Sequence, residues 1–483
     1  MHPANILPVE VWMKVFRHIS DLESGSSTCS LDSLLKNLMF ASRSFYNLFR
    51  PLFWETFSLD FTGSNRDSSL DKVSMVIREP WLGACVRHLK LRVALLGAGF
   101  TRNGIWSSDL ADQDIFPDFA FTLIPLLTQV YTVTLDFGRT NPVESFCRYS
   151  PFLDIWVHLC RTIRVLDVQL PPTSLPILSE AFQNTKPILL QELSLHLLRD
   201  DSNTFSIEDS QKDITHIMDV IRPSLHTLSI KSAVLGGQIL PALGQLPKLK
   251  NFAFHVSNTK SDNVTFYHEF LERQESTLTH FSLFSDFTCS DASSFWFPTE
   301  SRRTNKLPGL TTILINSTSP LPQLTAYAST LTTLIIAPSK HWALSYRQVN
   351  ALVTGISTSL HGGVLQNLYL KVDSLVPEQF DLFSTHLTRL RSLTLQYTFL
   401  LETSFQWRGY PPGGFRMNMI KRRYPDWHLG SIDLVQYNGT TRKYMRDQSL
   451  IEVLTTCIPS AKHIPLDPST FMRRHGLSNV EPF

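Results

Sequence analysis

Cysteine, histidine, serine and aspartate are the residue types that could carry metal or acyl-transfer chemistry in this sequence. Cys147, His158 and Cys160 lie close together, but no fourth ligand follows at zinc-binding spacing. The six cysteines include no C-x-x-C pair. There is no G-x-S-x-G motif, no P-loop and no G-x-G-x-x-G motif, and the scattered Ser, His and Asp residues do not indicate a triad. We therefore expect no catalytic residue, no metal and no cofactor.

A basic segment is the next candidate for chemistry. RMNMIKRRY, residues 416–424, clusters four basic residues. Such a cluster can serve as a nuclear localisation signal or as a phosphate-binding patch. A solvated turn in the C-terminal cap of the fold is the interpretation that we favour.

Composition limits the class of protein. Of the 483 residues, 43% are hydrophobic and 18% are charged. The charged share lies below the ~25% of an average domain, so the chain can form a core and is not typical of disorder. The formal net charge is +2, which provides no overall field for nucleic acid or for an anionic membrane. We expect neither as a partner.

Cysteine usage and hydropathy indicate the compartment. Cysteines without a pairing pattern predict reduced thiols in a reducing environment. Glu10, Lys14 and Arg17 interrupt the apolar N-terminal segment, which therefore lacks the core of a signal peptide. No run approaches the ~20 apolar residues of a membrane span. The expected location is intracellular, in the cytoplasm, the nucleus or both.

The first elements that could position a site form a short helical module. In LPVEVWMKVFRHIS, residues 7–20, apolar residues recur at helical spacing, and Pro8 suits a first turn. A second apolar block covers residues 31–59, where Phe45, Leu48 and Phe49 predict a helix. Pro51 is expected either to end this helix or to begin the next turn. A module of ~55 residues has a marginal core, so we expect a partner to complete it.

This module resembles the F-box family. The family's opening pattern L-P-x-E-x-x-x-x-[IV]-F-x-x-[IL] is present, followed by two leucines, the element ASRSF and a closing Trp-Glu, at Leu7, Pro8, Glu10, Val15, Phe16, Ile19, Leu34, Leu35, residues 41–45 and Trp54. The resemblance implies docking on the Skp-type adaptor and, through it, on the cullin of SCF ubiquitin ligases. It assigns the adaptor contact, or its direct support, to Leu7, Pro8, Glu10, Phe16 and Trp54. The alternative is a small helical cap on the following domain.

The rest of the chain repeats the pattern L-x-x-L-x-L, with any large apolar residue allowed. Clear copies are LHTLSI from Leu225, LQNLYL from Leu365 and LRSLTL from Leu390. Twelve copies lie between Val86 and Leu429, 343 residues over eleven intervals, or about 31 residues each. Each copy predicts a strand that buries its apolar face by stacking on its neighbours.

These copies resemble leucine-rich repeats, although the asparagine that usually follows the strand is absent. The resemblance implies an α/β fold: a small all-α F-box module and then an irregular solenoid, or horseshoe, with parallel strands on its concave face. The two resemblances together are typical of the fungal F-box/leucine-rich-repeat type. The expected domains are the F-box module at 1–59, a linker or first capping helix at 60–80, the solenoid at 81–440 and a C-terminal cap at 441–483.

Residues that alternate with the strand leucines are expected to face a protein target. They are Lys90, Arg92, Asp136, Asp167, Gln169, His196, Lys231, His255, Tyr369, Lys371, Gln396 and Asp433. At Leu314, Ile335 and Ala337 these positions are apolar, which indicates either a binding surface or strands covered by an insertion. The aromatic-rich segment 284–309 is the candidate cover.

The sequence therefore predicts a receptor without catalysis of its own. In this hypothesis the F-box binds the adaptor while the repeats capture an unidentified protein target for ubiquitination. The alternative is an F-box/leucine-rich-repeat interaction scaffold that acts without ubiquitin transfer. A third hypothesis, an enzyme whose site lies between repeats, has no motif in its favour.

Overall fold

The computed structural model describes most strands and helices of the chain, in two compact units, residues 1–225 and 226–483. The described residues are 11, 14, 43–60, 65–92, 99–100, 106–107, 122–137, 156–185, 189–199, 206–232, 234–256, 264–285, 308–316, 330–337, 343–358, 364–401, 413–438, 443–445 and 448–463.

The first unit is built on parallel strands that pair in chain order. They are β1 (Thr56–Asp60), β2 (His88–Arg92), β5 (Thr132–Asp136), β6 (Val165–Leu170) and β7 (Glu192–Leu197). A small antiparallel pair lies apart, β3 (Gly99–Phe100) with β4 (Trp106–Ser107). The connections contain α3 (Arg43–Phe53), α4 (Arg66–Arg78), α5 (Pro80–Cys85), η5 (Ile124–Leu126), η6 (Pro172–Ser174), α8 (Leu175–Asn184) and α9 (Ile207–Ile221).

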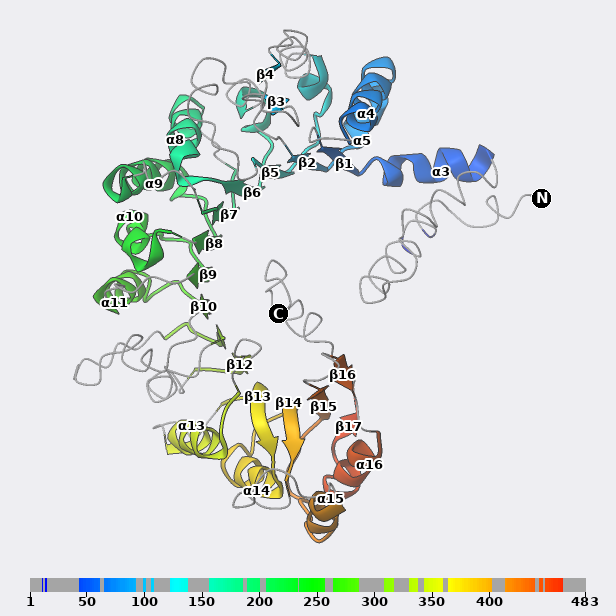
Figure 1. Ribbon diagram of the computed structural model, residues 1–483, viewed down its shortest axis with the longest axis vertical. Helices are drawn as coiled ribbons and strands as arrows, with labels where there is room; N and C mark the ends of the chain where they lie inside the picture. Colours follow the sequence, from blue (N-terminus) through cyan, green and yellow to red (C-terminus); the bar gives the residue numbers. More distant parts are fainter. Residues whose placement is uncertain are drawn as a thin grey trace. The chain divides into compact units, whose positions relative to one another are not determined.

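Helices and strands of this unit share an apolar core. Alternate strand residues such as Leu89 and Leu91 are buried, and Figure 1 shows α8 and α9 together on one side of β6 and β7. Trp156 stacks on Phe182 of α8, with ring centroids 4.7 Å apart. This arrangement follows from the period of two along a strand, which directs every second side chain to the helices.

The second unit continues the same pattern. Its parallel strands are β8 (Thr227–Ser232), β9 (Asn251–Val256), β10 (His280–Ser285), β11 (Thr312–Ile315), β12 (Thr333–Ile336), β13 (Asn367–Leu375), β14 (Ser392–Leu400) and β15 (Ser431–Asn438). On β15, β16 (Lys443–Met445) pairs antiparallel and β17 (Lys462–His463) pairs parallel. The helical elements are η7 (Gly236–Ile239), α10 (Leu240–Leu243), α11 (Val264–Arg273), α13 (Tyr346–Thr358), α14 (Pro377–His386), α15 (Gly413–Ile420) and α16 (Gln448–Cys457).

All twelve predicted hexapeptides lead into a parallel strand, and in each case the strand begins at the third residue. The first residue of every copy, from Val86 to Leu429, is at most 1% exposed. The predicted α/β fold of leucine-rich-repeat type is thereby confirmed. The boundaries of the four predicted domains stay predictions.

A thirteenth parallel strand, β1, was not predicted. It belongs to the hexapeptide WETFSL, residues 54–59, which fits the same pattern with Trp54 in first position. The strand lies within the range assigned to the helical module. Of the two expectations for Pro51, the one that it ends the helix is wrong, because α3 continues to Phe53 and the Trp54 amide donates to the Arg50 carbonyl, 3.1 Å away.

Backbone atoms join consecutive repeats at the entry to each strand. The carbonyl of the second hexapeptide residue accepts two amides from the next repeat. Thr279 O, for example, accepts Thr311 N at 2.9 Å and Thr312 N at 3.1 Å, and Glu55 O accepts two amides of β2's hexapeptide in the same way. We call this arrangement the carbonyl ladder. It recurs between neighbouring hexapeptides within both units and uses no asparagine side chain.

Candidate functional site

The strands of the first unit present a second side opposite their leucines. Three rows of residues in register occupy it, and the ten residues of the second and third rows along the strands are all half-buried or exposed. We call them the polar face: Ser58, Lys90, Thr134, Asp167 and Ser194 in one row, and Asp60, Arg92, Asp136, Gln169 and His196 in the other. Six residues that were predicted to face a target, from Lys90 to His196, are thus brought together.

Arg92 lies between two carboxylates of the polar face. Its guanidinium is 3.3 Å from Asp136 and 3.8 Å from Asp60. The Arg92 side chain is 58% exposed, so these ion pairs contribute little stability. Their effect is to neutralise Arg92 and to hold its side chain among its neighbours.

Helix α4 fixes the edge of the polar face at Asp60. Ser69 Oγ accepts the Asp60 amide and donates to the Asp60 carbonyl, both at 2.9 Å. Asn65 Nδ2 donates to the Asp60 carboxylate at 3.0 Å. Because Ser69 is buried, the backbone of Asp60 is held by the folded helix rather than by solvent-exposed groups.

Lys90 and Asp167 lie in one row, separated by Thr134 on the strand between them. Two strand spacings of about 4.8 Å place their Cα atoms roughly 10 Å apart. Burial raises the pKa of the Asp167 carboxyl, Asp136 raises it further and Lys90 partly lowers it. Neither side chain has a hydrogen bond or an ion pair within the described part of the chain.

The corresponding strand positions of the second unit differ in their exposure to solvent. Lys231 and His255 are half-buried. The last four residues assigned to a target surface, Tyr369, Lys371, Gln396 and Asp433, are between 1% and 7% exposed. This burial differs from the outward position expected of them, and their contact with a target stays a prediction.

Local contacts explain part of this burial. Tyr369 Oη donates to Gln396 Oε1 at 2.9 Å, and the Lys371 ammonium lies 6.0 Å from the centroid of the Tyr437 ring. Burial lowers the pKa of Lys371 to about 8. A lysine in this setting is a polar group held inside the fold, next to an aromatic ring.

The apolar positions on the strands before β13 are buried as well. Phe284, Leu314, Ile335 and Ala337 form one cluster with Tyr369, each at most 5% exposed. In the structure these positions therefore do not form an open apolar surface. Residues 286–307 of the candidate cover lie outside the described residues.

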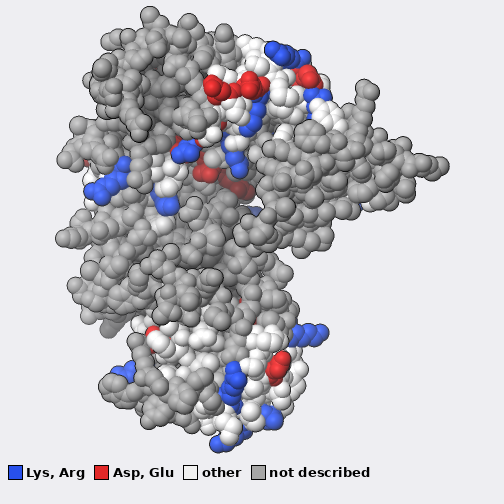
Figure 2. Space-filling model, turned by 45° about the vertical axis from the view of Figure 1, so that its right-hand side comes forward, with Lys and Arg blue, Asp and Glu red and all other residues white. Residues whose placement is uncertain are grey.

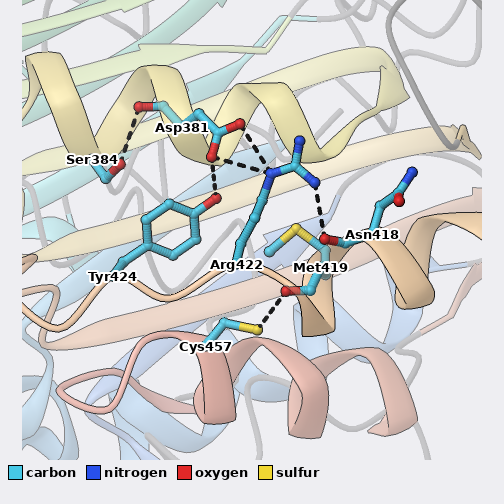
Figure 3. A network of polar contacts seen from close by, with 7 residues as sticks. All are labelled: Asp381, Ser384, Asn418, Met419, Arg422, Tyr424 and Cys457. Carbon is cyan, nitrogen blue, oxygen red and sulfur yellow. Dashed lines mark hydrogen bonds and ion pairs between the residues drawn. The ribbon is translucent and has the colours of Figure 1, made fainter.

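The basic segment RMNMIKRRY is partly helical and partly engaged in the fold. Figure 3 shows the Asp381 carboxylate between Arg422 and Tyr424, with Arg422 Nε at 3.0 Å and Tyr424 Oη at 2.6 Å. Arg422 also donates to the Asn418 carbonyl at 2.9 Å. Residues 416–420 lie in α15 rather than in a turn. The segment therefore offers two exposed basic side chains, Lys421 and Arg423, rather than four.

Trp54 is buried and does not itself face solvent. It is 6% exposed, and its ring lies 5.6 Å from that of Phe57 in β1. Helix α3 is held by Arg50, which pairs with Glu79 and lies over the rings of Tyr46 and Trp81. A role of Trp54 in adaptor binding stays a prediction, and in this position it would support a contact from beneath.

The other predicted adaptor residues, Leu7, Pro8, Glu10 and Phe16, lie outside the described residues. Of the three residues Cys147, His158 and Cys160, Cys147 also lies outside the described residues, His158 is exposed and Cys160 is buried. No group of three His, Cys, Asp or Glu side chains in the described ranges could hold a metal ion. No helix in those ranges combines the length and apolar character needed to cross a membrane.

Charge on the described surface is mixed. Among the described residues of the face drawn in Figure 2, Lys and Arg side chains are interspersed with Asp and Glu side chains. A surface of this kind favours recognition by matched pairs of charges over attraction to a polyanion.

Comparisons with known proteins give only a distant likeness. No family model matches the chain, and no curated protein matches it. A solved structure of the Rad7–Elc1 complex of yeast covers 83% of this chain and 92% of its own, at 14% identity and a TM-score of 0.39. The structure of the leucine-rich-repeat protein LegL7 of Legionella pneumophila matches over 83% of this chain and 96% of its own, at 11% identity and a TM-score of 0.34. At these scores neither likeness adds to what the chain's own strands show.

Proposed function

We propose that this chain is a non-catalytic protein-binding scaffold whose polar face contacts a target protein. The observation that carries the proposal is the set of ten polar side chains in fixed register on five parallel strands. Such an array is pre-organised, because the backbone positions of its side chains are fixed before any partner binds. Lys90 and Asp167 have no hydrogen-bond or ion-pair partner among the described residues, so they give the face charge to offer to a target.

We further propose that the N-terminal module docks on a Skp-type adaptor. That docking would make the chain a substrate-recognition subunit of an SCF-type ubiquitin ligase, which brings target lysines close to a charged ubiquitin carrier. The support is the F-box pattern between Leu7 and Trp54 in the sequence. The alternative is an interaction scaffold that binds the adaptor without directing ubiquitin transfer.

Adaptor docking can be tested with the purified full-length chain and a purified Skp-type adaptor. Leu7→Ala combined with Pro8→Ala should abolish their association and leave thermal unfolding unchanged. Lys212→Ala, on the exposed side of α9, is the matched control and should bind normally. Unchanged association in the Leu7/Pro8 variant would remove the adaptor from the proposal.

A truncation of residues 1–59 is unsuitable for this test. It would remove α3 and all but one residue of β1, and so expose the edge of β2 that β1 covers. Loss of binding in such a truncated chain would not separate docking from misfolding. Point variants avoid this problem.

Target capture and turnover distinguish the receptor from the scaffold. Proteins that bind the full chain but not a Lys90→Ala/Asp167→Ala variant are target candidates. The receptor predicts that these proteins persist longer in cells when the chain is deleted. If their half-lives do not change on deletion, the scaffold without ubiquitin transfer is the correct function.

A further inference from the structure

We propose that the polar face selects an extended segment of its partner that carries one acidic and one basic side chain about three residues apart. The acidic side chain contacts Lys90 and the basic one contacts Asp167. This inference rests on the proposed function, because it names the chemistry of the partner at the same face.

The spacing follows from the register of the strands. Lys90, Thr134 and Asp167 are direct neighbours on β2, β5 and β6. The Cα atoms that carry the two charged side chains are therefore separated by two strand spacings, roughly 10 Å. An extended segment in polyproline II conformation advances about 3.1 Å per residue with three residues per turn, so side chains i and i+3 lie on the same side and span this distance.

The sign of each contact follows from which charges are already satisfied. Arg92 is neutralised between Asp60 and Asp136, whereas Lys90 and Asp167 have no ion-pair partner among the described residues. Lys90 therefore offers a free positive charge. Asp167 offers a free negative charge, close to the Asp136 carboxylate that repels it.

A basic side chain at Asp167 would gain from this repulsion. The pKa of Asp167 is raised by its burial and by Asp136, and Lys90 lowers it only in part, so the charge of the ionised form is incompletely compensated in the free chain. A cation placed beside Asp167 supplies that compensation. Gln169, next along β6, can add a hydrogen bond to a guanidinium or an ammonium.

An extended segment fits the polar face better than a helix does. A bound helix is usually held by an apolar stripe that lies in a hydrophobic groove. The polar face contains no aliphatic or aromatic side chain apart from the imidazole of His196, and the adjoining row on the same side contributes one aliphatic residue, Val165, which is too little for a hydrophobic groove. An extended polar segment needs no groove and can cross β2, β5 and β6 with its side chains directed at the two free charges.

The test selects random peptides displayed on phage against the full-length chain and three variants. The wild type should enrich an acid and a base three residues apart. Lys90→Glu should enrich two bases at that spacing, and Asp167→Lys should enrich two acids. The control is a charge exchange on exposed positions of α9, Glu208→Lys with Lys212→Glu, which should enrich the wild-type pattern.

Affinity gives the second measurement. For a synthetic copy of the most enriched wild-type peptide, each single reversal at Lys90 or Asp167 should weaken binding about tenfold, because an attraction of up to ~1 kcal/mol becomes a repulsion. The control variant, Glu208→Lys with Lys212→Glu, should bind this peptide with the affinity of the wild type. Thermal unfolding of each variant should match the wild type, since both side chains contact solvent.

The outcomes separate the two proposals. Peptides that depend on the polar face but lack the acid–base pair overturn this inference and leave the proposed function standing. Peptides enriched equally by the wild type and by both reversals overturn the inference and remove the polar face from the proposed function. Failure to enrich any peptide overturns the inference, while capture of target proteins decides the function independently.

Discussion

The pH dependence of stability should reveal the burial of Lys371, which lies in β13 of the second unit on the side opposite the strand leucines. Burial lowers the pKa of its amine from 10.5 to about 8. Between these values the unfolded chain binds more protons than the folded chain, so the free energy of unfolding rises as the pH rises through this window. The full difference corresponds to about 3 kcal/mol, of which about 2 kcal/mol is recovered between pH 7 and pH 9.5.

Urea unfolding of the full chain at these two pH values measures the effect. Lys371→Met removes the titrating amine, and Lys371→Arg keeps a charge throughout the window. The wild type should gain about 2 kcal/mol relative to either variant on going to pH 9.5. Comparison with the variants cancels the opposite effect of the thiols of Cys160 and Cys457, whose pKa values are raised by burial. An equal response of wild type and Lys371→Met would refute the reasoning.

Three further predictions concern the core, a close contact and the polar face. Leu249 is the fully buried first residue of a hexapeptide, so Leu249→Ala should lower the free energy of unfolding, measured by urea titration, by about 2–5 kcal/mol. Lys250→Ala, at the exposed next position, should change it by less than about 0.5 kcal/mol. Gly83→Ala would place a Cβ 2.7 Å from the Leu126 carbonyl, so α5 must shift from η5, and calorimetry should show a loss of about 1–3 kcal/mol. Because the pKa of Asp167 is raised, its affinity for a lysine- or arginine-bearing peptide should fall on acidification at a higher pH than that of an ordinary carboxylate. A titration by fluorescence polarisation measures this dependence, and Asp167→Asn should remove it.

The strands could be predicted because their signal is local. Three apolar positions in six residues determine where a strand begins and which side of it is buried, and they do so at Val86 as well as at Leu429. β1 escaped prediction although its signal is just as local. The first position of its hexapeptide holds Trp54, which the F-box resemblance also assigns to the end of the helical module, and one residue can satisfy both patterns.

The candidate site could be predicted only in part. Alternation along a strand shows which side a residue occupies, but not what else packs on that side. It therefore placed Lys90 and Asp167 on the side opposite the leucines, where Lys90 is exposed and Asp167 half-buried, and gave the same assignment to Lys371 and Asp433, which the structure buries. The ion pairs that neutralise Arg92 also depend on neighbours distant in sequence, and no local pattern indicates them.

The carbonyl ladder has a consequence for how such a chain can change over evolution. Each joint between repeats is made of one carbonyl and two amides, which every residue other than proline can supply. A repeat can therefore be duplicated, lost or lengthened without a matching change in the side chains of its neighbour. Selection then acts on three apolar positions per repeat and leaves the others free to vary. Chains built in this way can diverge until sequence comparison no longer connects them, while their strands still stack in the same manner.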